Sequence, residues 1–159
     1  MTRVGFGYDI HRFGKGRPLV LGGVRIPHTL GLIGHSDADV LIHAICDALL
    51  GAAALGDIGR HFPNTDPKYK GISSLKLLAE VERLLKKKGY RILNIDSTVV
   101  LETPKITPFI QTMQENIANI LRIHQQEISI KATTHEGLGA IGSGMGCAAY
   151  CIVSLIPET

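Results

Sequence analysis

The chain has 159 residues, of which 45% are hydrophobic and 19% are charged, and its formal net charge is +3. This balance is typical of one globular domain with its own core, and it excludes an intrinsically disordered chain. No apolar run is long enough to span a bilayer and no basic stretch precedes a long apolar core, so we expect no membrane association, no signal peptide and a cytoplasmic location.

Two strands are predicted in the first part of the chain. Apolar residues alternate with other residues over Val4–Asp9, which is typical of a strand. A second strand is predicted over Leu19–Ile26, where the adjacent Gly22 and Gly23 suggest a bulge.

A helix is predicted next. Ser36, with Asp39 three residues later, resembles a capping box, and apolar residues recur at helical spacing as far as about Ala53. The stretch from Gly56 to Gly71 is irregular, and its length alone is only a weak sign of function.

The second half of the chain predicts a helix, a strand, a helix and two strands. In order, these elements are Ser73 or Ser74 to Lys88, Ile92–Leu101, Thr107 to about Leu121, Ile128–Ala132 and Cys147–Ile156. The last strand is almost wholly apolar, which favours cover on both of its faces. We expect an α/β (α+β) fold in a single domain, residues 1–159, with a mixed sheet of four to five strands and helices packed on one face.

The basic residues and the cysteines both favour structural roles. The only basic run, Lys86–Lys88, ends a predicted helix just before Gly89, and no aromatic residues alternate with the lysines, so we expect no nucleic-acid partner. Three cysteines, Cys46, Cys147 and Cys151, form no C-x-x-C pair and have apolar neighbours, which predicts core residues and no disulfide framework.

Three residues could form a metal site. Asp9 and His11 would share one strand face, about 6–7 Å apart along the chain. His43 lies in the first predicted helix, and a carboxylate with two imidazoles can bind zinc with a fourth position open. Asp47, four residues after His43, could orient the other ring nitrogen of His43. A turn aspartate, a surface histidine and a hydrogen-bonded helix histidine form the alternative, which these residues alone leave open.

Other polar residues allow both functional and structural interpretations. His35 and Ser36 precede the first helix, where free backbone N–H groups favour an anion, although Ser36 could simply cap the helix. Thr133 and Thr134 end a predicted strand, where they could bind a ligand or merely lie at the strand edge.

In sequence order, several segments resemble the 2-C-methyl-D-erythritol 2,4-cyclodiphosphate synthase family over essentially the whole chain. The segments are GYDIHRF, LGGVRIP, GHSDADVLIHAICDALLGAAALGDIGRHFPNTDP, ETPKI and KATTHEGLG. The resemblance implies a phosphorus-oxygen lyase of non-mevalonate isoprenoid biosynthesis. Its substrate would be 4-CDP-2-C-methyl-D-erythritol 2-phosphate, which closes to the 2,4-cyclodiphosphate and releases CMP.

The resemblance also implies metals and a homotrimer. It implies Zn²⁺ on Asp9, His11 and His43, and a second ion, Mg²⁺ or Mn²⁺, held through the substrate phosphates and Glu136. The active sites would lie between neighbouring subunits. The attacking 2-phosphate is already mostly anionic near neutral pH, since its second pKa is about 6, so the reaction needs charge neutralisation and in-line positioning more than a strong base.

The resemblance further implies two groups of substrate-binding residues. The erythritol phosphate would lie near His35, Ser36, Asp57, Ile58, Gly59 and the loop from Phe62 to Asp66, with Asp9 and His11 also in contact with the substrate. The cytidine part would lie against the segment from Leu101 to Thr107, including Pro104, Lys105 and Ile106, and against Ala132, Thr133 and Thr134, with Glu136 near the phosphates. His35 and Thr134 match positions that steady the transition state.

Two other functions remain as alternatives. A zinc phosphohydrolase would use metal-bound water, but no residue stands out as its base. A non-catalytic carrier of isoprenoid diphosphates would use the cavity at the trimer axis. Where the family often has an aromatic residue, an arginine and an acidic residue, this chain has Ala140, Ser143 and Met145, and the missing arginine counts against the carrier.

Overall fold

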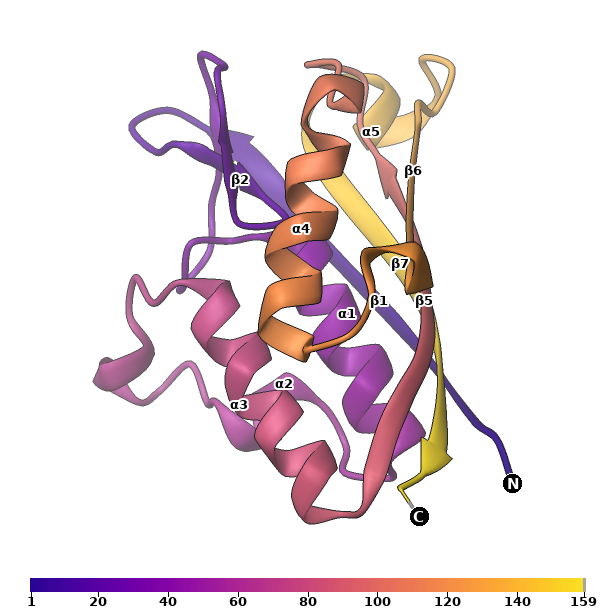
Figure 1. The fold of residues 1–159 in the computed structure, drawn as a ribbon. Coiled ribbons are helices and arrows are strands. Elements are labelled where there is room, and N and C mark those ends of the chain that lie inside the picture. The colour runs from indigo at the N-terminus through magenta and orange to yellow at the C-terminus, as the bar shows by residue number, and fades with distance from the viewer. Residues whose placement is uncertain (159) are drawn as a thin grey trace.

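A five-stranded mixed sheet forms one layer of the structure, a computed structural model that describes residues 1–158 (Figure 1). Its strand order is β4-β1-β7-β5-β6. The bounds in that order are Gly31–Leu32, Arg3–Gly14, Gly146–Pro157, Tyr90–Val100 and Ile128–Thr133. Strands β5 and β6 pair in parallel, and the other pairs are antiparallel, which confirms the mixed sheet.

Three long helices lie on one face of the sheet, as the sequence predicts (Figure 1). They are α1 (Val40–Ala52), α3 (Ser74–Lys87) and α4 (Ile110–Leu121). Shorter helices are α2 (Ile58–His61), α5 (Gly139–Gly142) and the 3-10 turns η1 (Pro67–Tyr69), η2 (Thr107–Phe109) and η3 (Gln125–Glu127). In residues 1–158, no helix is both long enough and apolar enough to cross a membrane.

Helix α1 lies unusually close to β1 because two residues of the strand lack a side chain. A Cβ atom on Gly5 would lie 2.0 Å from the backbone oxygen of Ala48, and one on Gly7 would lie 1.9 Å from the backbone oxygen of Ala44. Neither distance is possible for a real side chain. The helix is buried at 11 of its 13 residues, so it forms the middle of the core.

The second predicted strand is a separate hairpin, so the expected bulge is wrong. Strands β2 (Leu19–Leu21) and β3 (Val24–Ile26) pair with each other, and Gly22 and Gly23 form the two-residue turn between them. Both glycines have a positive φ, which a two-residue hairpin turn requires.

Asp39 caps α1, so the expectation that Ser36 caps this helix is also wrong. The Asp39 side chain accepts hydrogen bonds from the backbone N–H groups of Ile42, Gly22 and Gly23. Ser36 instead accepts from the N–H of Ala38, just before the helix. Because burial opposes its charge, Asp39 has a pKa raised to about 6 despite these three hydrogen bonds.

The other two long helices begin differently from α1. Neither Ser73 nor Thr107 forms a side-chain cap: Ser73 precedes α3 without a capping hydrogen bond, and Thr107 lies inside η2, which leads into α4. The carboxylate of Asp37, which comes from the loop before α1, accepts the N–H of Ser74 at the start of α3.

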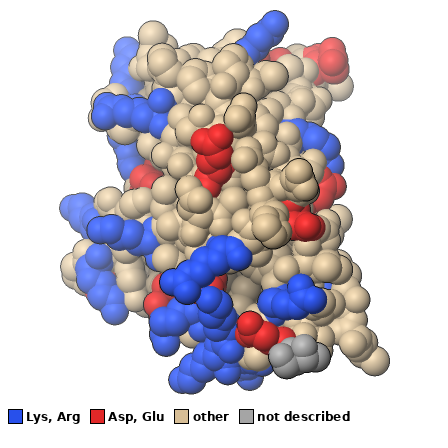
Figure 2. Space-filling view, in the orientation of Figure 1, with Lys and Arg blue, Asp and Glu red and all other residues tan. Residues whose placement is uncertain are grey.

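The ends of the helices and the cysteines agree with expectation. Lys86 and Lys87 lie in the last turn of α3. Figure 2 shows basic side chains gathered at the lower end of the molecule, where α3 ends in Figure 1. Cys46, Cys147 and Cys151 are buried free thiols.

The outer face of the sheet is open in the single chain, which corrects the expectation that β7 is covered on both faces. Along β7, Tyr150 and Ile152 are 37% and 52% exposed. On the neighbouring β1, Phe6 and Tyr8 are 61% and 43% exposed, and their rings lie near that of Tyr150. An apolar strand pattern predicts that the strand is buried, but it does not identify the helix or subunit that covers it.

The close approach of α1 to β1 can be tested with two glycine variants. In Gly7→Ala the new methyl group must push the helix away, so we expect a loss of about 1–3 kcal/mol of stability in urea unfolding. Gly51, in the same helix, has open space around its Cβ position, so Gly51→Ala is the matched control and should raise stability by about 1 kcal/mol or less. A Gly7→Ala protein as stable as wild type would contradict the packing described here.

Candidate active site

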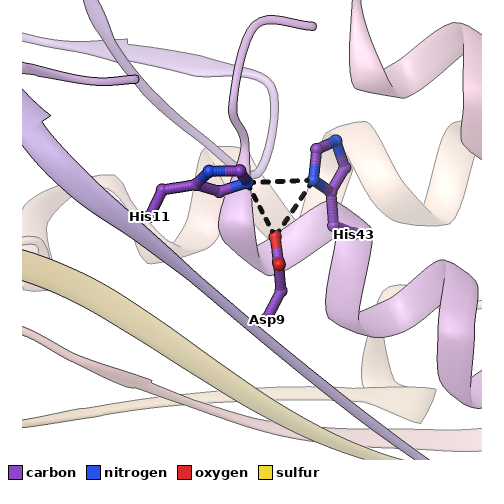
Figure 3. A group of neighbouring side chains, drawn as sticks. All are labelled: Asp9, His11 and His43. Atoms are coloured by element: carbon purple, nitrogen blue, oxygen red, sulfur yellow. Dashed lines mark hydrogen bonds and ion pairs between the residues drawn. The ribbon is translucent and has the colours of Figure 1, made fainter. Parts of the chain in front are cut away.

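Asp9, His11 and His43 converge on one point between β1 and α1 (Figure 3). The Asp9 Oδ2 atom lies 3.0 Å from Nε2 of His11 and 3.0 Å from Nδ1 of His43. The two nitrogen atoms are 3.4 Å apart. The sequence therefore predicted this grouping correctly, including the shared face of Asp9 and His11.

The local backbone structure positions each of these three side chains in the cluster. Asp9 follows Gly7 by two residues, and His43 lies in the first turns of α1, so the contact between Gly7 and α1 brings the two together. The Nδ1 atom of His11 lies 2.9 Å from the backbone oxygen of Ile33. A carbonyl can only accept, so Nδ1 carries the proton and Nε2 presents a lone pair to the cluster.

The cluster favours a charged Asp9. Burial alone would raise the pKa of Asp9, but hydrogen bonds and charge from His11 and His43 outweigh it and lower the pKa to about 2. Burial likewise opposes protonation of His43, yet its hydrogen bond to Asp9 and the negative charge there raise the pKa of His43. Without an ion, the negative charge of Asp9 thus favours a proton on His43, beside the place where a cation would bind.

These donors fit a zinc ion. Two imidazole nitrogens and one carboxylate oxygen form a common three-ligand set for Zn²⁺. With bond lengths near 2.0 Å and tetrahedral angles, the ligand atoms lie about 3.3 Å apart. The three distances in the cluster, 3.0, 3.0 and 3.4 Å, match this spacing.

Asp47 does not orient His43, contrary to expectation. Its Oδ1 atom accepts the backbone N–H of Ile58 at 2.8 Å and so fixes the start of α2. The free ring nitrogen of His43, Nε2, instead faces the Oγ atoms of Ser74 at 2.9 Å and Ser36 at 3.1 Å. Sequence spacing could not identify Ser74, since it lies 31 residues away on another helix.

A cavity of about 180 Å³ opens beside the cluster. Its lining includes eight residues that the sequence predicted for the site: Asp9, His11, His35, Ser36, His43, Ile58, Gly59 and Phe62. It also includes Asn64, from the predicted loop Phe62 to Asp66, and three residues that the sequence did not predict: Tyr69, Ile72 and Leu77. Tyr69 comes from the irregular 56–71 stretch, whose length was the only sequence signal for it.

His35 offers a free polar atom at this cavity. Its Nε2 atom is buried and has no hydrogen-bond partner within residues 1–158. Buried polar atoms are nearly always paired, so an unpaired one beside a cavity points to a partner outside the chain.

Two residues of the first predicted group, Asp57 and Asp66, do not line the cavity. Asp57 caps α2 by accepting the N–H of Arg60, and Asp66 caps η1 by accepting the N–H of Lys68. Their side chains therefore hold the wall of the cavity in shape.

The second predicted group lies elsewhere in the chain. The segment from Leu101 to Thr107 follows β5, and the segment from Ala132 to Glu136 starts in the last two residues of the parallel strand β6. None of their residues lines the cavity. The two segments are tied together by a hydrogen bond from the backbone N–H of His135 to Glu102 Oε1 at 2.7 Å. One chain thus carries two separate groups of predicted site residues.

Comparison with known proteins gives consistent matches. The model of the YgbB family matches residues 2–156. A protein of Agathobacter rectalis named 2-C-methyl-D-erythritol 2,4-cyclodiphosphate synthase is 61% identical over 153 residues, which cover 96% of this chain and 86% of that protein. A protein of the same name from Syntrophomonas wolfei is 60% identical over 151 residues, 95% of this chain and 96% of that protein.

Solved structures of similar fold support the same family. The bifunctional IspDF of Campylobacter jejuni superposes with a TM-score of 0.94 at 46% identity, covering 98% of this chain, which spans only 42% of that longer protein. IspF of Plasmodium falciparum in complex with CDP superposes with a TM-score of 0.87 at 36% identity, covering 99% of this chain and 97% of that one. With a family match over almost its whole length and this identity to named synthases, the chain belongs to the YgbB family, the 2-C-methyl-D-erythritol 2,4-cyclodiphosphate synthases.

Proposed function

We propose that this chain is a zinc-dependent, cytoplasmic cyclodiphosphate synthase that converts 4-CDP-2-C-methyl-D-erythritol 2-phosphate to 2-C-methyl-D-erythritol 2,4-cyclodiphosphate and CMP. The observation that carries the proposal is the Asp9-His11-His43 cluster, which opens on a cavity lined by His35 in a chain of this family. A bound Zn²⁺ would act as a Lewis acid on a substrate phosphate.

The residues around the cluster suit a substrate that brings its own nucleophile. In the proposed reaction, a 2-phosphate oxygen bonds to the β-phosphorus while the bond from that phosphorus to the CMP oxygen breaks. The unpaired Nε2 of His35 could donate to a phosphate oxygen when protonated. The role of the chain is then to orient the two phosphates in line and to offset their charge.

The cavity size indicates that only part of the substrate lies there. About 180 Å³ suits the phosphate and erythritol part, while a whole cytidine diphosphate ester needs more room. We therefore assign the cytidine part to the second group, the segments from Leu101 to Thr107 and from Ala132 to Glu136. Thr134 Oγ1 accepts the backbone N–H of Glu136, which leaves the hydroxyl proton of Thr134 free to donate to a phosphate. Glu136 offers a carboxylate suited to Mg²⁺ or Mn²⁺.

A homotrimer would bring the two groups together. Six apolar residues lie on the open face of the sheet and are 37–67% exposed in the single chain: Val4, Phe6, Tyr8, Ile10, Tyr150 and Ile152. A contiguous apolar surface of this kind is typical of a protein interface. We propose that this face packs against two further copies, so that the second group of one chain completes the cavity of its neighbour.

Isotope labelling tests the reaction itself. In ¹⁸O-labelled water, we expect the cyclic product and CMP to contain no label, because the substrate's own phosphate is the nucleophile. Both products can be analysed by mass spectrometry after complete turnover. Label in either product would mean that water attacks, and a zinc phosphohydrolase would then replace the synthase.

Removal of one ligand tests the metal site. We expect His43→Ala to lose bound zinc and to lose activity by more than about 100-fold. Loss of a residue that only hydrogen-bonds to a metal ligand costs up to about 100-fold, and loss of the ligand itself should cost more. His124→Ala, at an exposed position after α4, is the control and should keep both. Full activity in a metal-free His43→Ala protein would rule out the cluster as the zinc site.

The open sheet face can be tested with a single charge. We expect Ile152→Lys to give a folded monomer in analytical ultracentrifugation, since a buried unpaired lysine opposes association. The monomer should keep zinc, because the three ligands come from one chain, but lose turnover. An active monomer at assay concentration, in this variant or in wild type, would contradict the shared site.

A further inference from the structure

The second ring nitrogen of His43 is held by a buried serine that begins another helix. The Oγ atom of Ser74 lies 2.9 Å from Nε2 of His43. Ser74 is fully buried and His43 is 7% exposed, so water does not compete for this contact. Ser74 is the first residue of α3, so the contact joins the starts of two helices.

The direction of this hydrogen bond is fixed by Asp37. The hydroxyl of Ser74 donates to Asp37 Oδ1, and its backbone N–H donates to Asp37 Oδ2 at 2.9 Å. A carboxylate only accepts, and a hydroxyl has a single proton to give. Since that proton points to Asp37, Ser74 can only accept toward His43, and the ring must carry its proton on Nε2.

The position of this proton matters for the metal site. The metal site is part of the proposed function, and this inference rests on it. With the proton on Nε2, the lone pair of a neutral His43 ring is on Nδ1, the atom 3.0 Å from Asp9 Oδ2. We infer that Ser74, held by Asp37, is a positioning residue that keeps Nδ1 of His43 aimed at the metal and free to bind it.

Ser36 does not do the same, although its Oγ lies 3.1 Å from the same ring nitrogen. It accepts the N–H of Ala38, and its own proton is not committed to an acceptor in residues 1–158. It can therefore either donate to Nε2 or accept from it. Once Ser74 is removed, Ser36 can accept the proton or stabilise the opposite tautomer, so the choice is no longer enforced.

Zinc affinity in two neighbouring serine variants tests the inference. The probe is Zn²⁺ alone, titrated into the full-length protein against a chromogenic chelator. We expect Ser74→Ala to bind zinc about 10-fold to 100-fold more weakly than wild type, the usual effect of losing an outer partner of a ligating histidine. Ser73→Ala is the matched control, because Ser73 forms no capping hydrogen bond, and it should bind within about twofold of wild type.

A second measurement uses wild type and does not depend on a variant that folds. In ¹⁵N-labelled, zinc-loaded protein, the ring resonances of His43 should show the proton on Nε2 and the metal on Nδ1. A proton on Nδ1, or equal zinc affinity in wild type and Ser74→Ala, would overturn the role of Ser74. A wild-type protein that binds no zinc would overturn the metal site itself, which is a separate result.

Discussion

Helix α1 can lie on β1 only because Gly5 and Gly7 leave room for the backbone oxygens of Ala48 and Ala44. That contact fixes how far His43 stands from Asp9, and a metal site tolerates little error in this distance. The N-cap of the same helix, Asp39, holds the β2-β3 turn, and Asp47 within the helix holds the start of α2. A shift of α1 would therefore move the metal ligand and two of its surrounding segments together.

The aspartates near the site fall into two kinds. Five of them, Asp37, Asp39, Asp47, Asp57 and Asp66, accept backbone N–H groups and so fix the starts of helices or turns. Asp9 differs, because within residues 1–158 its carboxylate forms hydrogen bonds and ion pairs only with the two histidines. Carboxylates bound by backbone N–H groups build the frame, and the carboxylate without them is the one available to a cation.

The sequence predicts features that depend on short-range patterns better than features that depend on contacts between distant segments. The period of two in β1 places Asp9 and His11 on one face, and helical spacing places His43 in a long buried helix, so the ligand set follows from short-range patterns. The cap of α1 is also short-range, since Asp39 accepts the N–H of Ile42, but the pattern assigned it to Ser36. The contact of Asp37 with the start of α3 and that of Ser74 with His43 depend on segments that meet only in the folded chain. The open face of β7 was missed because an apolar strand has the same pattern whether a helix or another subunit covers it.

The pairing of β1 with β7 has a further consequence for how the chain folds. Arg3 pairs with Leu155, so the strand that carries Asp9 and His11 finds a neighbour along most of its length only in residues 146–157. On a ribosome, the first 43 residues would contain all three zinc ligands long before that neighbour is synthesised. Contacts of such high sequence separation form slowly, and until then the surface of α1 that packs on β7 is uncovered. Assembly of the zinc site is thus expected to wait until residues 146–157 have been synthesised, and until then the apolar surface of the nascent chain is available to chaperones.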